Sequence, residues 1–338
     1  MSGVSTGTVD RFLHKRGKVS EEAQKKVEKV LKEIDYQPNL IARSLALKKN
    51  YHLISILPSF AEGEYWDKVS KGIEKAEKAY MSYNVVNEHL YFNQFDQSTF
   101  DALIPRIKEI DCQGVVIATL FRDSVLQLTQ LLDDLDIPYV LIDAFVENTN
   151  CLSFFGTNSF DSGYIAGRLL LEQIRKTDDL ALFRFIRQGE NNMQMSNREA
   201  GFRDYMERHD YEGQIHLVKL HADEVDKNAG ILDNFLMAHP NVDMGIIFNS
   251  RAYLLGDYFL SKHTDFHIIG YDELDANLKH LQNGCITHLI GQRPEVQGYN
   301  SVRSLFKHLV LHEDDEKMNY MPIDILIKEN IRYYNNYI

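Results

Sequence analysis

The sequence predicts a mainly α/β protein in which a small all-helical N-terminal segment precedes a large body of two lobes, each built on a parallel sheet. From residue 51 on, short apolar runs alternate with amphipathic stretches, in two successive sets. Alternation of this kind is typical of parallel sheets, and two sets indicate two lobes. Residues 1–50 carry 11 Lys and Arg against 6 Asp and Glu, whereas the rest of the chain has a net charge of −17. A basic segment on an acidic body suggests that the segment contacts phosphates while the body does something else.

Two helices are expected in the N-terminal segment. Ser5 can cap a helix from residue 6 to about 14, and Ser20 can cap the next one, whose first turn is acidic as the helix dipole favours. A basic loop at 15–18 lies between them, and Asn39 can cap a further short segment at 39–46. The expected inward faces are Val9, Phe12 and Leu13 in the first helix, and Ala23, Val27, Val30, Leu31 and Ile34 in the second.

The strings GVSTGTVDRFL and KVSEEAQKKVEKVLKEIDYQPNLIARSLA resemble the DNA-binding headpiece of the lactose-repressor (LacI/GalR) family over residues 3–46. The resemblance implies a helix-turn-helix whose recognition helix meets base edges and phosphates in the major groove. It also implies a hinge helix at 39–46 that enters the minor groove. The DNA-contacting residues that it implies are Ser5, Thr6, Gly7, Thr8, Arg11, Lys18, Asn39, Ala42, Arg43 and Leu45.

These residue types suit DNA, with two departures from the family pattern. Arginine can bind guanine through two hydrogen bonds, and an apolar wedge such as Leu45 bends DNA at a cost of a few kcal/mol. Gly7, however, has no side chain to contact a base, and Asp10 stands where the family usually has a small hydroxyl.

No first helix precedes Gly3, so we expect an N-terminally truncated headpiece. Burying one apolar side chain contributes about 1.5–3 kcal/mol, and a headpiece of this size has little margin to lose. We therefore expect weak or absent DNA binding from this polypeptide. The residues expected to lack a covering partner are Val4, Val9, Val27 and Leu31.

The body resembles the periplasmic-binding-protein type effector domain of the same family. Strands are expected at 53–57, 85–86, 115–118 and 139–142, and in the second set at 180–186, 215–220, 244–248 and 266–269. Helices are expected at 100–110 and along the stripe Trp66, Val69, Ile73, Ala76 and Tyr80. The resemblance is carried by the strings VLID (140–143), GTN (156–158), SNREAGF (196–202), FN (248–249), IGYD (269–272) and GQ (291–292). It implies a headpiece and hinge at 1–50, a first lobe at about 51–157 and 292–320, and a second lobe at about 158–291 and 321–338.

A ligand in this architecture lies between the lobes, at the carboxyl ends of the strands. The resemblance implies that the polar groups binding the effector are Arg198, Asn249, Asp272 and Gln292, with Asn158 and Asp161 as further candidates. An ion pair within one lobe, or a helix cap, is the alternative for Arg198 and Asp272. Tyr65 and Trp66 offer aromatic faces to a pyranose or purine ring, although Trp66 serves equally well as a core residue. Ser250 stands where the family commonly has Asp, which leaves the effector's identity open.

The sequence contains no motif typical of an enzyme, a cofactor site or a metal site. No phosphate loop, nucleophile elbow, GxGxxG or metal-binding spacing occurs, so we expect no enzyme activity, no cofactor and no metal. Residues 312–316 are expected to form a solvated acidic loop, and the three scattered cysteines to be reduced. No apolar run approaches the roughly 18–20 residues of a membrane span, and no signal peptide opens the chain, so we expect a cytoplasmic protein.

The sequence therefore predicts a ligand-responsive transcription regulator that acts as a homodimer on a pseudo-palindromic operator. A sugar or sugar derivative bound between the lobes would change operator affinity allosterically. The alternative is a small-molecule sensor that has lost DNA binding.

Overall fold

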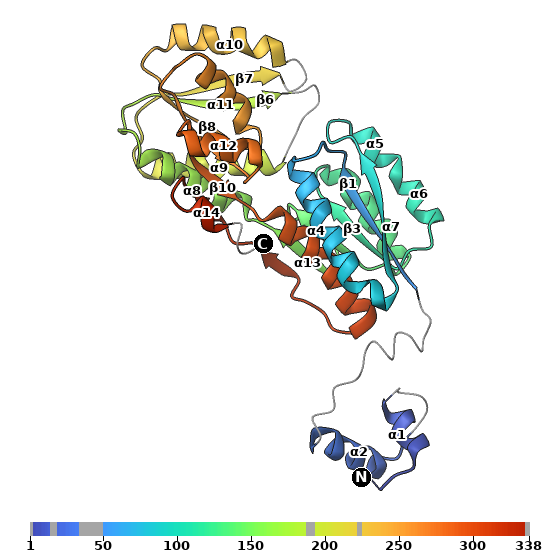
Figure 1. Ribbon diagram of the computed structural model, residues 1–338. Helices are drawn as coiled ribbons and strands as arrows, with labels where there is room; N and C mark the ends of the chain where they lie inside the picture. Colours follow the sequence, from blue (N-terminus) through green and yellow to red (C-terminus); the bar gives the residue numbers. More distant parts are fainter. Residues whose placement is uncertain (1–2, 14–18, 34–49, 187–192, 222–224, 335–338) are drawn as a thin grey trace. The chain divides into compact units, whose positions relative to one another are not determined.

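The computed structural model describes residues 3–13, 19–33, 50–186, 193–221 and 225–334, and the chain divides into two units, 1–49 and 50–338 (Figure 1). The hinge helix predicted at 39–46 and the basic loop at 15–18 lie outside the described residues. With them lie five of the predicted DNA contacts: Lys18, Asn39, Ala42, Arg43 and Leu45.

The first unit contains the two predicted helices, α1 (Thr6–Leu13) and α2 (Glu21–Glu33). Both predicted caps are confirmed. The Ser5 hydroxyl accepts from the Thr8 amide at 3.3 Å, and the Ser20 hydroxyl accepts from the Ala23 amide at 3.4 Å. Val27 is only 2% exposed, so the expectation that it lacks a covering partner is wrong. The reason is that α1 packs against α2.

The second unit is built on two six-stranded sheets with the same strand order, which confirms the predicted fold class. The first sheet runs β11-β5-β4-β3-β1-β2 and is parallel throughout. The second runs β12-β10-β9-β8-β6-β7, and only its edge strand β12 is antiparallel. The strands of the first sheet are β1 (Tyr51–Pro58), β2 (Val85–Phe92), β3 (Gly114–Ala118), β4 (Tyr139–Asp143), β5 (Ser153–Gly156) and β11 (Met318–Tyr320). Those of the second are β6 (Leu180–Ile186), β7 (Ile215–His221), β8 (Met244–Ile247), β9 (His267–Tyr271), β10 (Ile286–Gly291) and β12 (Asp324–Leu326).

Helices cover both faces of each sheet, and the core lies between helices and sheet (Figure 1). Strand β6 shows the arrangement: Phe183 and Phe185 point to one core and Leu182 to the other, as the two-residue period of a strand requires. With the first sheet lie α4 (Tyr65–Tyr80), η1 (Met81–Tyr83), α5 (Gln97–Asp101), α6 (Leu103–Glu109), α7 (Arg122–Asp134), α13 (Pro294–Phe306) and η2 (Lys307–Leu311). With the second lie α8 (Ser159–Leu171), α9 (Met193–Arg208), α10 (Val225–Ala238), α11 (Ala252–Ser261), α12 (Asp275–Asn283) and α14 (Ile331–Tyr334).

The eight predicted strands are all present, but the single helix predicted at 100–110 is wrong. Two short helices, α5 and α6, replace it, with the break at Ala102. Pro105 explains the break, because a proline has no amide hydrogen and its ring opposes the carbonyl four residues earlier.

Two pairs of helices cross at very close range, one pair in each lobe. In the first lobe α4 meets α13 at Gly72 and Gly298, where an added Cβ would lie 2.0 and 2.1 Å from a carbonyl oxygen of the other helix. In the second lobe α8 meets α9 at Gly163 and Gly201, where the same distances are 1.8 and 1.9 Å. Only glycine lets two backbones approach this closely. The second crossing fixes the position of α9, which carries a residue of the candidate site.

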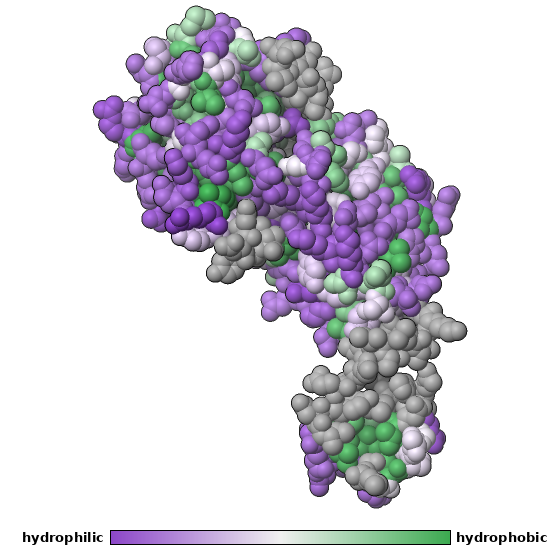
Figure 2. Space-filling model, viewed as in Figure 1, coloured by the Kyte–Doolittle hydropathy of each residue, from purple (hydrophilic) through white to green (hydrophobic). Residues whose placement is uncertain are grey.

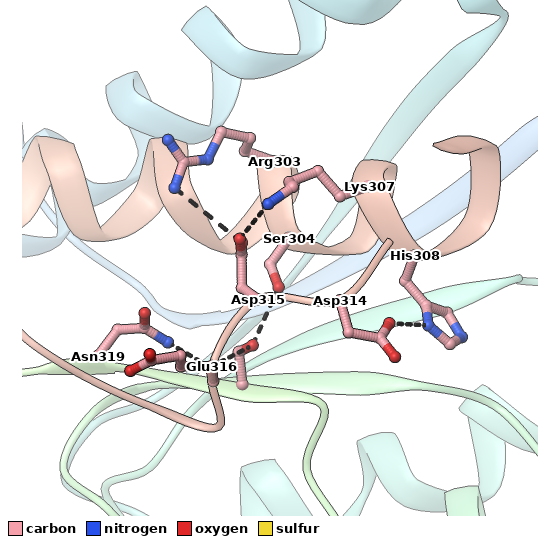
Figure 3. Close-up of polar contacts among 9 residues, drawn as sticks. Arg303, Ser304, Lys307, His308, Asp314, Asp315, Glu316 and Asn319 are labelled. Atoms are coloured by element: carbon pink, nitrogen blue, oxygen red, sulfur yellow. Dashed lines mark hydrogen bonds and ion pairs between the residues drawn. The ribbon is translucent and has the colours of Figure 1, made fainter. Parts of the chain in front are cut away.

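The acidic stretch at 312–316 is only partly a solvated loop, so that prediction is wrong for Asp315. Its side chain is 11% exposed and pairs with Lys307 and Arg303, which reach it from η2 and α13 (Figure 3). The other residues of the stretch are exposed, and one of them, Asp314, accepts from the His308 imidazole at 2.7 Å. These partly buried ion pairs connect the end of α13 to the segment leading to β11.

Most of the visible surface of the second unit is hydrophilic (Figure 2). In the described part of the chain, no helix combines the length and the apolar character needed to cross a bilayer.

Candidate functional site

The candidate site is a cleft between the two lobes of the second unit, with a cavity of about 100 Å³. The carboxyl ends of strands from both sheets meet there: Asp143 ends β4, Asn249 follows β8 and Asp272 follows β9. The lining residues from the first lobe are Glu64, Tyr65, Trp66, Gln94, Leu120 and Asp143. The others are Gln194, Met195, Arg198, Asn249, Ser250, Arg251, Asp272 and Gln292.

Arg198 on α9 is the anchor of the cleft, with 2% of its surface exposed. Its Nη1 donates to the carbonyl of Phe248 at 2.8 Å, and its Nη2 donates to Oε1 of Gln292 at 2.5 Å. The guanidinium also lies 4.3 Å from the centre of the Tyr271 ring. The buried Nε has no hydrogen-bond partner among the described residues, so it is a charge-assisted donor that a ligand can use.

Gln292 links Arg198 to Asp272. While its Oε1 accepts from Arg198, its Nε2 donates to Oδ1 of Asp272 at 2.7 Å. Burial raises the pKa of Asp272 to about 7, and the nearby Arg198 only partly opposes this rise. The side chain of Asp272 thus accepts from an amide that also lines the cleft, and the charge of Arg198, in the same lobe, acts on it. A ligand contact by Asp272 and an ion pair within one lobe both stay predictions.

Asp143 is the matching acid of the first lobe. Its Oδ1 accepts from the Tyr65 hydroxyl at 3.2 Å and from the Gln194 amide at 2.7 Å, and Gln194 comes from the second lobe. Burial raises the pKa of both Asp143 and Tyr65. The Gln194 bond is thus a direct link between the lobes.

Asp143 was not predicted as a site residue, although a signal for it exists. Strands β4 and β9 occupy the same place in the two sheets, and each leads into an aspartate: VLID at 140–143 and IGYD at 269–272. Both aspartates have a positive φ, 84° for Asp143 and 69° for Asp272. Strained backbone of this kind is concentrated at functional sites. Gln194 and Arg251 were also missed, and no motif marks them.

The predicted aromatic residues both lie on the cleft. Trp66 packs edge-on against Tyr65, with ring centres 5.0 Å apart, and Trp66 is 7% exposed. It also belongs to the core of the first lobe, so the geometry accommodates both alternatives, a ligand contact and a core role.

The remaining predicted residues differ in their placement. Asn249 lines the cleft, and its Oδ1 accepts from the Arg251 amide at 3.0 Å. Asn158 and Asp161 are not among the cleft-lining residues. Asn158 is the N-cap of α8 and accepts from the Asp161 amide at 3.2 Å. A ligand contact by these two stays a prediction.

The described DNA-contact candidates lie on or just before α1. Ser5, Thr6, Gly7 and Arg11 are exposed, and Thr8 is half-buried. The Arg11 Nε donates to the Gly7 carbonyl at 3.1 Å, which leaves its two terminal nitrogens available. Their contacts with DNA stay predictions.

Within the described ranges, no group of three or more His, Cys, Asp or Glu side chains could hold a metal ion.

The fold and the cleft define a class: a two-lobed ligand-binding protein that carries a small helix-turn-helix unit at its N-terminus. Comparison with known proteins agrees with this class. Residues 54–313 match the family model of the periplasmic binding protein domain, and residues 1–39 match that of bacterial regulatory proteins of the lacI family. The chain belongs to the LacI family of bacterial regulatory proteins.

Individual relatives are similar over nearly the whole chain or the whole second unit. The ribose operon repressor of Lactococcus lactis is 25% identical, over 98% of this chain and 95% of the relative. The crystal structure of a candidate LacI transcriptional regulator from Bacteroides fragilis is 38% identical, with a TM-score of 0.81, and covers 85% of this chain and 100% of that one. A glucose-galactose binding protein from Geobacillus stearothermophilus shares the fold, at 21% identity and a TM-score of 0.72, over 84% of this chain and 99% of its own.

Proposed function

We propose that this protein is a transcription regulator that binds operator DNA through its first unit and a neutral sugar or sugar derivative in the cleft of its second unit. The observation that carries the proposal is the presence, on one chain, of a lacI-type helical unit and a two-lobed unit with a polar cleft. We further propose that it acts in the cytoplasm as a homodimer, because a pseudo-palindromic operator requires two headpieces.

The chemistry of the cleft supports a polyhydroxylated ligand. Hydroxyls both donate and accept, and the cleft offers donors at Arg198 together with acceptors at Asp143 and Asp272. Trp66 and Tyr65 add aromatic surface against which the apolar face of a sugar ring can pack. Relatives named as ribose and sucrose operon repressors point to the same ligand class.

The link between the lobes supports a ligand-dependent response. The bond from Gln194 to Asp143 and that from the Lys68 ammonium to the Glu273 carbonyl, at 3.0 Å, both join the two lobes. A ligand that binds these groups changes the balance between more open and more closed arrangements, and only such differential binding produces allostery.

The ligand arm of the proposal is tested by the fluorescence of Trp66, the only tryptophan of the chain. A panel of neutral pentoses, hexoses and polyols is titrated into the protein and into Arg198→Ala. At least one sugar is expected to change the fluorescence saturably, and Arg198→Ala is expected to lose the change. Arg208→Ala, an exposed position on the same helix, is the matched control.

The DNA arm is tested by selecting bound sequences from a random duplex pool and measuring anisotropy with and without the active sugar. Sequence-preferring binding that changes with the sugar is expected, with a steep loss of affinity as salt increases. Saturable sugar binding without any sequence preference would instead establish the sensor that has lost DNA binding.

A further inference from the structure

The second lobe contains an apolar pocket that the proposed function does not use. Residues of α10, α11 and the ends of β6 and β7 line it, and its volume is about 320 Å³. A dry cavity of roughly 150 Å³ lined by such side chains is enough to hold benzene. The pocket therefore has room for an aromatic ring with a short alkyl chain. Its apolar wall consists chiefly of Phe185, Leu220, Leu232, Leu254 and Leu255.

The polar groups of this pocket are mostly occupied. Asn228 accepts from the His221 amide at 2.7 Å and donates to the His221 carbonyl at 2.9 Å. The Tyr258 hydroxyl donates to Asp233 at 2.7 Å, so its hydrogen is directed to that carboxylate. Asp257 is the exception, because its side chain is 60% exposed and, among the described residues, only its Oδ1 has a hydrogen-bond partner.

That partner, His280, holds the carboxylate in place. His280 is 1% exposed and lies against α11, where a Cβ on Gly256 would come within 2.5 Å of the ring. The Asn283 Oδ1 accepts from the Cys285 amide at 3.1 Å, which turns the Asn283 Nδ2 toward Nδ1 of His280 at 3.3 Å. With Nδ1 next to Asn283, the other ring nitrogen of His280, Nε2, contacts Oδ1 of Asp257 at 2.9 Å.

No lysine or arginine of the described segments forms an ion pair with Asp257. An oriented carboxylate at the rim of an apolar pocket complements a molecule with a hydrocarbon body and a cationic head. We propose that this pocket is a second ligand site, separate from the sugar cleft, and that it takes a small hydrophobic primary amine whose ammonium group pairs with Asp257.

The pocket is close to the cleft but distinct from it. Phe185 lines the pocket, and its ring centre is 6.0 Å from the guanidinium of Arg251, which lines the cleft. Helix α11 begins at Ala252, directly after the cleft-lining residues Asn249, Ser250 and Arg251. A ligand in the pocket would thus contact the helix that carries part of the cleft.

The test uses the full-length protein and three probes that share one skeleton: 4-phenylbutylamine, 4-phenylbutan-1-ol and 4-phenylbutyrate. Calorimetric titration is expected to show saturable binding of the amine, binding of the alcohol at least roughly fivefold weaker, and no binding of the acid. Asp257→Asn should lower amine affinity to that of the alcohol and leave alcohol affinity unchanged. Asp265→Asn, at a side chain that is 97% exposed, is the charge-matched control and should bind as the unmodified protein does.

A second variant identifies the pocket itself. Ala229 lines the pocket at an exposed position, so Ala229→Phe should fill the mouth without disturbing the core and abolish binding of amine and alcohol. The proposal is overturned if the amine shows no saturable binding up to roughly 10 mM, or if it binds Ala229→Phe or Asp257→Asn with undiminished affinity. If the amine changes Trp66 fluorescence and its affinity is the same in both variants, it occupies the cleft, and this outcome also overturns the proposal.

Discussion

The buried carboxyl of Asp272 should make the stability of the protein fall as pH rises. Its pKa is raised from 3.8 to about 7 because burial disfavours the charged form. Between these two values the folded state binds more protons than the unfolded state, so the free energy of unfolding decreases with increasing pH. Each pH unit in that interval represents about 1.4 kcal/mol, which gives a loss of about 3 kcal/mol between pH 5 and pH 8.

Asp272→Asn removes this dependence while keeping the geometry. The amide oxygen of Asn can still accept from Gln292, which donates to Oδ1 of Asp272 at 2.7 Å. Relative to the unmodified protein, the free energy of unfolding of the variant should increase by about 3 kcal/mol as the pH goes from 5 to 8. Urea unfolding followed by Trp66 fluorescence and circular dichroism measures this difference. Asp265→Asn, at a 97% exposed side chain, should show no such gain. If the unfolding free energies of Asp272→Asn and of the unmodified protein change with pH in parallel over this range, the reasoning is refuted.

Two further predictions concern the helix crossing and the headpiece. Gly163→Ala places a Cβ 1.8 Å from the Arg198 carbonyl oxygen, so it should lower stability by about 1–3 kcal/mol and weaken sugar binding, as seen by thermal unfolding and Trp66 titration. Gly230→Ala is its control, because nothing lies within 4 Å of the new Cβ and stability should stay the same or rise slightly. An equal loss of stability in both variants would show that the helix crossing is not the cause. Arg11→Ala should weaken binding to the selected operator by about 1–3 kcal/mol while changing binding to unrelated duplexes much less, measured by anisotropy. An equal loss on both duplexes would make Arg11 a phosphate contact only.

Most of the correctly predicted residues of the candidate site lie in motifs, whereas Tyr65 and Trp66 were predicted from their aromatic side chains alone. Arg198, Asp272 and Gln292 lie in strings typical of the family, and the structure brings all three to one cleft. Gln194 carries no such mark, because its role depends on the bond to Asp143, 51 positions earlier in the chain. Asn158, conversely, sits in a matching string but serves as a helix cap outside the cleft lining.

The sequence by itself determined the strands, the helix caps and the family. These features depend on local patterns: the period of apolar residues, a hydroxyl before a helix, and contiguous strings of matching residues. Tertiary structure alone decided that Asp143 faces Gln194 across the lobes and that the side chain of Asp315 is only 11% exposed within a solvated stretch. The physical reason is that burial and electrostatic environment are set by groups distant in the chain, so no local pattern contains them.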